Sequence, residues 1–152
     1  MARWRKGEAE VVRLEHEGKL QYITGAAANG APLLAQARTT VTTAASLLET
    51  DAYSAFVLAY DAARFACVAL LAQQGLRATV DGGHLGVENT VRAQFGDGFR
   101  PFADLRRRRN ELEYPRLPAD TATVDEARQA VEVARGLIDV AGRLLDQLSF
   151  FA

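Results

Sequence analysis

The sequence predicts an all-α fold, an up-and-down bundle of about five helices with a short N-terminal helical arm. Three observations support this prediction. Hydrophobic residues make up 49% of the chain and are mostly alanine, leucine and valine, and alanine is the strongest helix former. In several segments, apolar residues recur at alternating spacings of three and four, as on one face of a helix. Runs of β-branched and aromatic residues, which are typical of strands, are missing.

The length and composition of the chain limit its possible functions. With 152 residues, the chain can form one domain with a sizeable core. Its net charge of −1 gives no overall field that attracts nucleic acid, so any such contact must be local. The single cysteine, Cys67, excludes an intrachain disulfide, and no Cys/His spacing is typical of a zinc site. We therefore expect no metal and no cofactor.

The sequence does not indicate a membrane segment or a signal peptide. No apolar run approaches the roughly 20 residues that a membrane span needs. The N-terminal residues MARWRKGEAEVV are basic and lack the apolar core of a signal peptide. We therefore expect a soluble, cytoplasmic protein that does not contact a membrane.

The first 30 residues (1–30) predict an N-terminal arm, and residues 31–150 predict the helical bundle. Within the arm, residues 8–17 predict a short helix that ends at Gly18. Residues 24–30, TGAAANG, predict a joint between arm and bundle, because Gly and Asn interrupt regular structure.

The segment from Pro32 to Gly75 predicts two helices. Proline suits the first turn of a helix, and apolar residues follow it at helical spacing. Thr50 and Asp51 predict an N-cap and an early-turn acid for the second helix, residues 52–74, which Gly75 ends. Because the second helix is apolar on nearly all sides, we expect it at the centre of the bundle.

Asp61 and Arg64 are the only charged residues in this central helix. Their i, i+3 spacing favours an ion pair between them or a position in solvent. Alternatively, Asp61 faces an arginine on another helix and supports a site there.

A glycine-rich segment, residues 76–86, predicts a loop that closes with GGHLG. It is not a phosphate loop, because it lacks the lysine and the spacing of a P-loop and no strand precedes it. His84 has two interpretations. It caps or packs at the start of the short helix expected over residues 87–95, or it has a catalytic role.

Residues 104–115, DLRRRRNELEYP, form the densest charge cluster of the chain. At about 100° per residue, Arg109 falls in the middle of an apolar stripe, and Glu113 lies on the same side. The four arginines are therefore not equivalent. The flanks of the stripe hold Arg106, Arg108 and Asn110.

Arg109 has two interpretations, because a guanidinium on an apolar stripe is costly unless it is paired or lies at an interface. Glu113, at i+4, can form a structural ion pair with it that fixes the packing. Alternatively, Arg109 presents its planar fork of N–H donors to a phosphate group. Both interpretations are consistent with the pattern.

The last segment predicts a long helix. Thr123 and Glu126 have the spacing of a capping box. Apolar residues then repeat at spacings of three and four as far as Leu148, which predicts a bundle seam. Phe150 and Phe151 follow, and this pair of terminal aromatic residues favours a dimer contact.

The order of these features resembles a HEPN domain, a helical bundle named for its occurrence in higher eukaryotes and prokaryotes. The resemblance rests on the helix AYSAFVLAYDAARFACVALLAQQGLR, the Gly-His loop after it, and RRRRNELEYP before a long last helix. It spans roughly residues 31–148. The composition and the arm are similar to a small bacterial branch of the family.

The resemblance implies a homodimer in which the motif helices meet at a shared cleft. Many relatives are metal-independent ribonucleases, often toxins paired with a small nucleotidyltransferase. Their motif is an arginine, a polar residue and a histidine that follows the arginine after a gap of about four to six residues. On this chain, Arg109 matches the arginine and Asn110 matches the polar residue.

The histidine of the motif has no match, because its position falls at Tyr114, Pro115 or Arg116. His16 and His84 lie outside the spacing. Cleaving RNA without a metal needs a base for the 2′-hydroxyl and an acid for the leaving oxygen, and tyrosine, with a pKa near 10, is a poor base. We therefore expect binding before cleavage. In some relatives the nucleotidyltransferase modifies a nearby tyrosine with AMP, a role that the position of Tyr114 suggests.

Three functional hypotheses follow. The first is a catalytically degenerate HEPN-like protein of a toxin–antitoxin or defence-type system, which binds RNA or nucleotide phosphates or a nucleotidyltransferase partner. Its binding residues are Arg106, Arg108, Arg109 and Asn110, with support from Asp61, Glu113 and His84. The second is an active ribonuclease toxin that uses Arg109, Asn110 and Tyr114, with Asp61 or His84. The third is a structural helical adaptor or dimerisation module.

Overall fold

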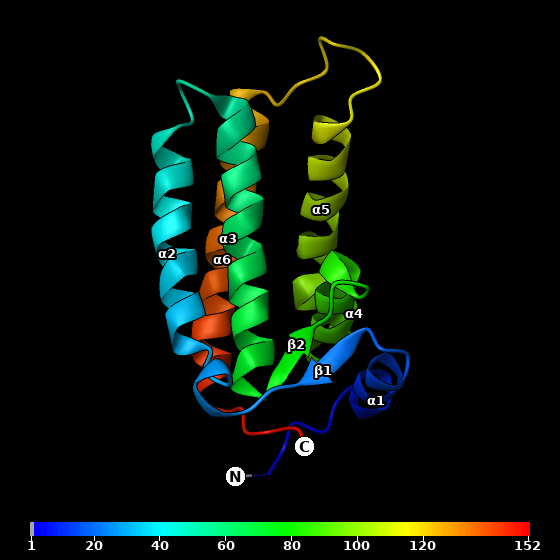
Figure 1. Cartoon of the computed structure of the whole chain (residues 1–152). Helices are drawn as coiled ribbons and strands as arrows, with labels where there is room; N and C mark the ends of the chain where they lie inside the picture. The colour runs from blue at the N-terminus through cyan, green and yellow to red at the C-terminus, as the bar shows by residue number, and fades with distance from the viewer. Residues whose placement is uncertain (1) are drawn as a thin grey trace.

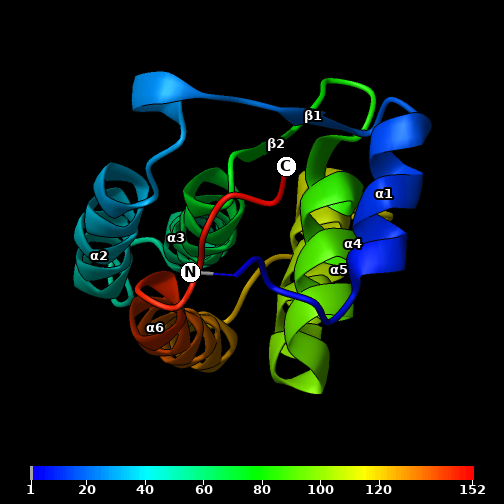
Figure 2. The same ribbon diagram turned by 90° about the horizontal axis from the view of Figure 1, so that it is seen from below.

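The fold is an all-α bundle, as the sequence predicts. The computed structural model describes residues 2–152. Helices α2 (Ala31–Ser46), α3 (Ala52–Gln73) and α6 (Val124–Leu145) pack together, while α4 (Gly83–Phe95) and α5 (Arg100–Glu113) cover another side of α3 (Figure 1, Figure 2). α2 and α5 run in one direction, and α3 and α6 run in the opposite direction (Figure 1).

α3 is the central helix, because helices on several sides bury it. Its buried residues include all but one of its alanines, and its polar residues are few. Asp51 rather than Thr50 is the N-cap: its Oδ1 accepts a hydrogen bond from the backbone N–H of Ser54 at 3.0 Å. The expected central position of this helix is confirmed.

α3 is also the one helix of residues 2–152 that is long and apolar enough, by length and composition, to cross a membrane. In the fold, 67% of its most apolar window is buried within the protein. Such burial is typical of the core helix of a globular protein.

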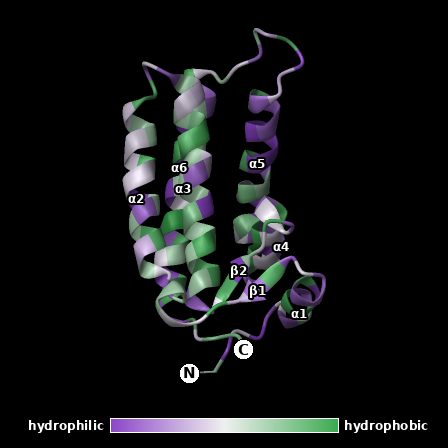
Figure 3. Cartoon of the chain, in the orientation of Figure 1, coloured by the Kyte–Doolittle hydropathy of each residue, from purple (hydrophilic) through white to green (hydrophobic). Residues whose placement is uncertain are grey.

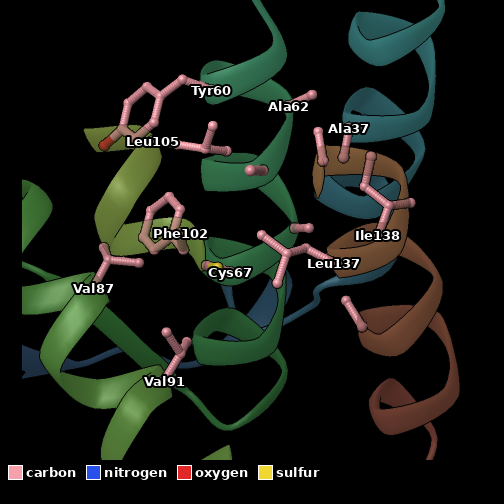
Figure 4. Close-up of a cluster of buried hydrophobic side chains, with 14 of the residues drawn as sticks. Ala37, Tyr60, Ala62, Cys67, Val87, Val91, Phe102, Leu105, Leu137 and Ile138 are labelled. Carbon is pink, nitrogen blue, oxygen red and sulfur yellow. The ribbon is translucent and has the colours of Figure 1, made fainter. Parts of the chain in front are cut away.

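The core has two parts, which lie on different sides of α3 (Figure 4). One part, toward α2 and α6, contains Ala37, Leu137 and Ile138. The other part, toward α4 and α5, contains Tyr60, Val87, Val91, Phe102 and Leu105. In contrast to α3, the C-terminal half of α5 is strongly hydrophilic (Figure 3). Most of the buried residues of α5 lie in its N-terminal half, and Leu112 is the buried residue of its charged half.

The last helix begins as predicted. The Thr123 hydroxyl accepts a hydrogen bond from the backbone N–H of Glu126 at 3.1 Å and caps α6. The apolar stripe of α6 then faces the core along the length of the helix. Of the two aromatic residues after it, Phe151 is buried, whereas Phe150 is 59% exposed.

The prediction of a loop over residues 76–86 was wrong at both ends. Strand β2 (Leu76–Ala78) pairs antiparallel with β1 (Leu20–Tyr22), with Leu20 opposite Ala78. At the other end, α4 begins at Gly83 instead of residue 87. The strands are too short to show a period of two in the sequence. Burial of Leu20 and Leu76 beneath the ribbon stabilises the pairing.

The arm packs against the bundle as well. It contains α1 (Glu8–His16), which contacts α4, and a short 3₁₀ helix, η1 (Gly25–Ala27), within the predicted joint. Trp4 donates a hydrogen bond from Nε1 to the carbonyl of Gln94 at 2.8 Å, and its ring lies against Phe95. A second 3₁₀ turn, η2 (Gly96–Phe99), joins α4 to α5. The arm thus supports the layer that α4 and α5 form.

Candidate functional site

A pocket of about 340 Å³ lies between the N-terminus of α4 and the C-terminal half of α5. We call it the α4–α5 pocket. The end of α4 contributes Gly82, His84 and Leu85, and α5 with its C-cap contributes Arg106, Arg109, Asn110, Glu113 and Tyr114. The structure therefore brings most of the predicted site residues to one place, including a histidine that the chain separates from the arginine run.

Arg109 reaches this pocket from the side of α5 that faces α3. Its Nη1 donates to Glu113 at 2.9 Å, so the predicted i, i+4 ion pair is confirmed. Its guanidinium carbon lies 5.5 Å from the centre of the Tyr60 ring, within cation–π range. Its buried Nε has no hydrogen-bond partner among the described residues. Arg109 is thus supported on an aromatic face and uses only part of its donor capacity.

His84 lies in the first turn of α4, where its ring stands parallel to that of Tyr60, at an interplanar angle of 5°. A hydrogen bond of 2.5 Å links Nδ1 to the Tyr60 hydroxyl. Partial burial lowers the pKa of His84, and the positive charges of Arg64 and Arg109 lower it further, against the opposing effect of Asp61. The imidazole is therefore mainly neutral near pH 7, with Nε2 left without a hydrogen bond in the part of the chain that the structure describes.

Tyr60 is the common support of His84 and Arg109. Its side chain is fully buried, and its ring also stacks on Phe102 with centroids 5.5 Å apart (Figure 4). Burial raises the pKa of the Tyr60 hydroxyl, so this group stays a neutral phenol that can hydrogen-bond to His84. Because Tyr60 comes from the central helix, the positions of both pocket side chains are tied to the core.

Arg106 lies one turn before Arg109 and joins the two helices of the pocket. Its Nε donates to the carboxylate of Glu88 on α4 at 2.5 Å. Glu88 is buried, and this pairing offsets the cost of burying its charge. Arg106 therefore has a structural contact on one side and lines the pocket on the other.

Arg108, which was predicted to join the binding residues, does not line the pocket. It reaches toward α6 instead, where it donates to Glu126 at 2.7 Å and to Asp120 at 3.2 Å. A third hydrogen bond runs to Glu111 at 3.1 Å. These carboxylates raise the pKa of Arg108 and occupy most of its donors. The structure thus assigns Arg108 to the packing of α5 against the chain that leads to α6.

The other two predicted residues, Asp61 and Tyr114, differ in their relation to the pocket. Asp61 does not line it and forms no ion pair with Arg64 within residues 2–152, so the proposed i, i+3 pair is not present. Its charge still acts on His84, whose pKa it raises. Tyr114 is the C-cap of α5 and lines the pocket with 73% of its surface exposed.

Sequence reasoning missed Gly82, which forms part of the pocket wall. A Cβ at Gly82 would lie 2.0 Å from the carbonyl oxygen of Lys19, so no side chain fits there. The Gly-Gly step before His84 was the available signal, because such a pair marks a close backbone approach. The approach itself depends on the arm, which no local pattern predicts.

Among residues 2–152, no three His, Cys, Asp or Glu side chains gather in a group that could hold a metal ion. Comparisons of the chain with protein-family models, with curated proteins and with solved structures found no match. The HEPN resemblance therefore stays a prediction. The chemistry of the pocket can be argued from its residues: two arginines, a neutral imidazole and the N-terminus of a helix favour an anionic ligand.

Proposed function

We propose that the α4–α5 pocket binds the phosphate groups of RNA or of a nucleotide. The observation that carries this proposal is the presence of Arg109 and His84 in one open pocket, although they belong to different helices. The pocket is rich in N–H donors, which phosphate oxygens accept.

Arg109 supplies the principal donors. A guanidinium has five N–H groups, and Glu113 accepts from only one nitrogen of Arg109. The side chain of Glu113 is 42% exposed, so its attraction for Arg109 is weakened by solvent and a phosphate can compete with it. Cation–π contact with Tyr60 fixes the plane of the guanidinium in advance, which lowers the entropic cost of binding.

The first turn of α4 adds further donors. The backbone N–H groups of His84 and Leu85 lie in this turn, where a helix has no carbonyl four residues earlier to accept them. The partial positive charge of a helix N-terminus favours an anion at this position. Arg109 and α4 thus approach the same ligand from two sides.

The experiment is a titration of fluorescently labelled single-stranded RNA with the wild-type protein and with Arg109→Ala. Loss of a phosphate contact reduces the affinity about tenfold and makes the dependence on salt concentration less steep by about one counterion. Arg107→Ala is the matched control, because Arg107 belongs to the same arginine run and is outside the pocket. Equal affinities for the two variants, both folded by circular dichroism, would contradict the proposal.

A second candidate function is metal-independent cleavage of RNA, and the position of His84 favours it. The arginine helix lacks the histidine of the ribonuclease motif, but His84 brings an imidazole into the same pocket from α4. Because its lowered pKa keeps it neutral near pH 7, His84 can accept the proton of a 2′-hydroxyl at Nε2 in the tautomer whose Nδ1–H donates to the Tyr60 oxygen. Water would protonate the leaving oxygen, and the products would be a cyclic phosphate and a 5′-hydroxyl.

Cleavage is tested by incubating RNA with the protein in the presence of EDTA. We expect His84→Gln to abolish cleavage and to leave most of the RNA affinity, because Arg109 remains. Intact RNA after incubation with the wild-type protein would exclude the ribonuclease and leave phosphate binding as the function.

The family resemblance adds a proposal about assembly, namely that the protein forms a cytoplasmic homodimer, within a toxin–antitoxin or defence-type system, and meets a nucleotidyltransferase. Light scattering coupled to size-exclusion chromatography tests the dimer. A monomer at micromolar concentration would remove the shared cleft from the proposal, whereas the α4–α5 pocket is formed within one chain.

A further inference from the structure

A second pocket, of about 270 Å³, adjoins His84 at the junction of α3, β2 and α4. We call it the α3–β2 pocket. Its lining consists of Arg64, Val68, Arg77, Ala78, Thr79, Gly83, His84 and Val87. His84 therefore lines both pockets. Arg106 and Arg109 line the α4–α5 pocket, and Arg64 and Arg77 line the α3–β2 pocket.

Among the described residues, the two arginines of the α3–β2 pocket have no acidic partner. No carboxylate within residues 2–152 forms an ion pair with Arg64 or Arg77, and the lining contains no acidic residue. The guanidinium of Arg64 lies 4.9 Å from the centre of the Phe65 ring, and its buried Nε is without a hydrogen bond there. Because no carboxylate neutralises its guanidinium, Arg64 keeps its charge for an anionic ligand.

Arg77 keeps its full charge for a different reason. It lies directly opposite Gln21 in the β1–β2 ribbon. With the amide of Gln21 turned so that its oxygen faces the guanidinium, both Nε and Nη2 donate to this oxygen at 3.1 Å. The amide orients Arg77 and, being neutral, does not cancel its charge.

A neighbouring pocket differs from the α3–β2 pocket, because carboxylates neutralise its cations. We call it the neutralised hollow. It lies on the other side of Gly82 and Leu85, between α1 and α4. It also contains two cations, but Arg13 is bonded to Glu17 at 2.7 Å and Lys19 to Asp81 at 2.6 Å. The uncompensated positive charge therefore lies on the α3–β2 side of His84, not all around the end of α4.

We propose that the two pockets on either side of His84 hold successive phosphates of one strand, so that the preferred ligand is a polynucleotide and not a mononucleotide. This inference rests on the proposed phosphate binding in the α4–α5 pocket. One phosphate lies at Arg106 and Arg109, the next lies at Arg64 and Arg77, and the imidazole of His84 stands between them. A mononucleotide has phosphate groups for one of these pockets only.

The test compares two probes, uridine monophosphate and a short oligouridylate, on three variants. NMR titration of the His84 ring signals measures the weakly bound mononucleotide, and fluorescence anisotropy measures the oligonucleotide. Arg77→Gln removes an exposed charge and keeps a polar side chain, so we expect the fold to be unaffected. Arg109→Ala removes the first phosphate contact, and Arg13→Gln is the matched control in the neutralised hollow.

We expect Arg77→Gln to weaken oligonucleotide binding about fivefold to tenfold, to lower its salt dependence, and to change mononucleotide binding less than about twofold. Arg109→Ala should weaken the binding of both probes, and Arg13→Gln should weaken the binding of neither. If Arg109→Ala weakens both probes and Arg77→Gln weakens neither, phosphate binding stands and the two-phosphate site is overturned. Equal weakening of both probes by Arg77→Gln also overturns it. If Arg109→Ala affects neither probe, the proposed function itself fails.

Discussion

Arg108 and Arg109 are neighbours in the sequence and are similarly covered, with 24% and 27% of their side chains exposed, yet they lie in different environments. Arg108 points toward α6 and donates to three carboxylates. Arg109 points toward α3, bonds one carboxylate and lies over the ring of Tyr60. The difference shows that a run of like charges has no single role, because each side chain takes its role from the element that it reaches.

The α6-facing side of α5 is therefore a packing surface, and the α3-facing side is the candidate site. We therefore expect substitutions on the two sides of α5 to have different effects. Substitutions on the first side should change stability and not affinity, and substitutions on the second should do the reverse.

The largest effect on stability is expected for Arg108→Ala. The substitution leaves Asp120, Glu126 and Glu111 without their common cation, and we expect the free energy of unfolding to fall by about 1 kcal/mol, since partly exposed pairs are each weak. Urea denaturation measures this change. If RNA affinity falls as far as in Arg109→Ala while stability is unchanged, the division between the two sides of α5 is wrong.

The next effect concerns the pKa of His84, which partial burial, Arg64 and Arg109 lower from its ordinary value of 6.5. Removing a positive charge nearby allows protonation, so Arg109→Ala should raise the pKa of His84, whereas Arg108→Ala should leave it unchanged. An NMR titration of the imidazole protons measures both. An equal response to the two substitutions would remove the electrostatic distinction between the arginines.

The same lowered pKa has a consequence for stability. Because the folded state binds the His84 proton more weakly than the unfolded state does, the contribution of this group is present above pH 6.5. It is lost as the pH falls below 6.5 through the lower pKa of the folded state. Denaturation curves of the wild-type protein and of His84→Gln should therefore differ in their pH dependence in this range.

The smallest effect is expected for Arg107→Ala. Arg107 is 56% exposed, and its one ion pair among residues 2–152 is with Asp104, one turn earlier on the same helix. Its removal should change the free energy of unfolding by less than about 0.5 kcal/mol and should not change RNA affinity. A thermal melt and one binding curve are sufficient, and a larger loss of affinity would show that the ligand contacts the whole run.

The features that the sequence predicted correctly are local. The helices of the bundle, the cap at Thr123, and the ion pair between Arg109 and Glu113 all depend on residues within a few positions of each other. Helical phase also placed Arg109 on the inner side of α5. Helical phase did not predict that the side chains of Arg106 and Arg108 are as little exposed as that of Arg109. Long arginine side chains bend toward partners on other elements, which the helical phase of α5 does not describe.

The features that it did not predict link distant segments. The partners of Arg108 at Asp120 and Glu126 lie 12 and 18 positions away, across a turn without regular structure. The β1–β2 ribbon joins the arm to the end of α3, and His84 meets Arg109 only because α4 and α5 both pack on Tyr60. Such contacts follow from the tertiary arrangement, so the spacing of residues within one segment does not predict them.

The close approach at Gly82 has a consequence for modular reuse of this fold. The first turn of α4 rests on the backbone of Lys19, and the Thr79 hydroxyl beside it donates to the carbonyl of Gly18 at 2.6 Å. The backbone of the arm therefore fixes the position of the first turn of α4, through main-chain atoms that a side-chain substitution leaves in place. A chimaera that joined the bundle to a foreign arm would keep the arginines. It would lose the backbone contact that positions α4, and with it the placement of His84 beside Arg109.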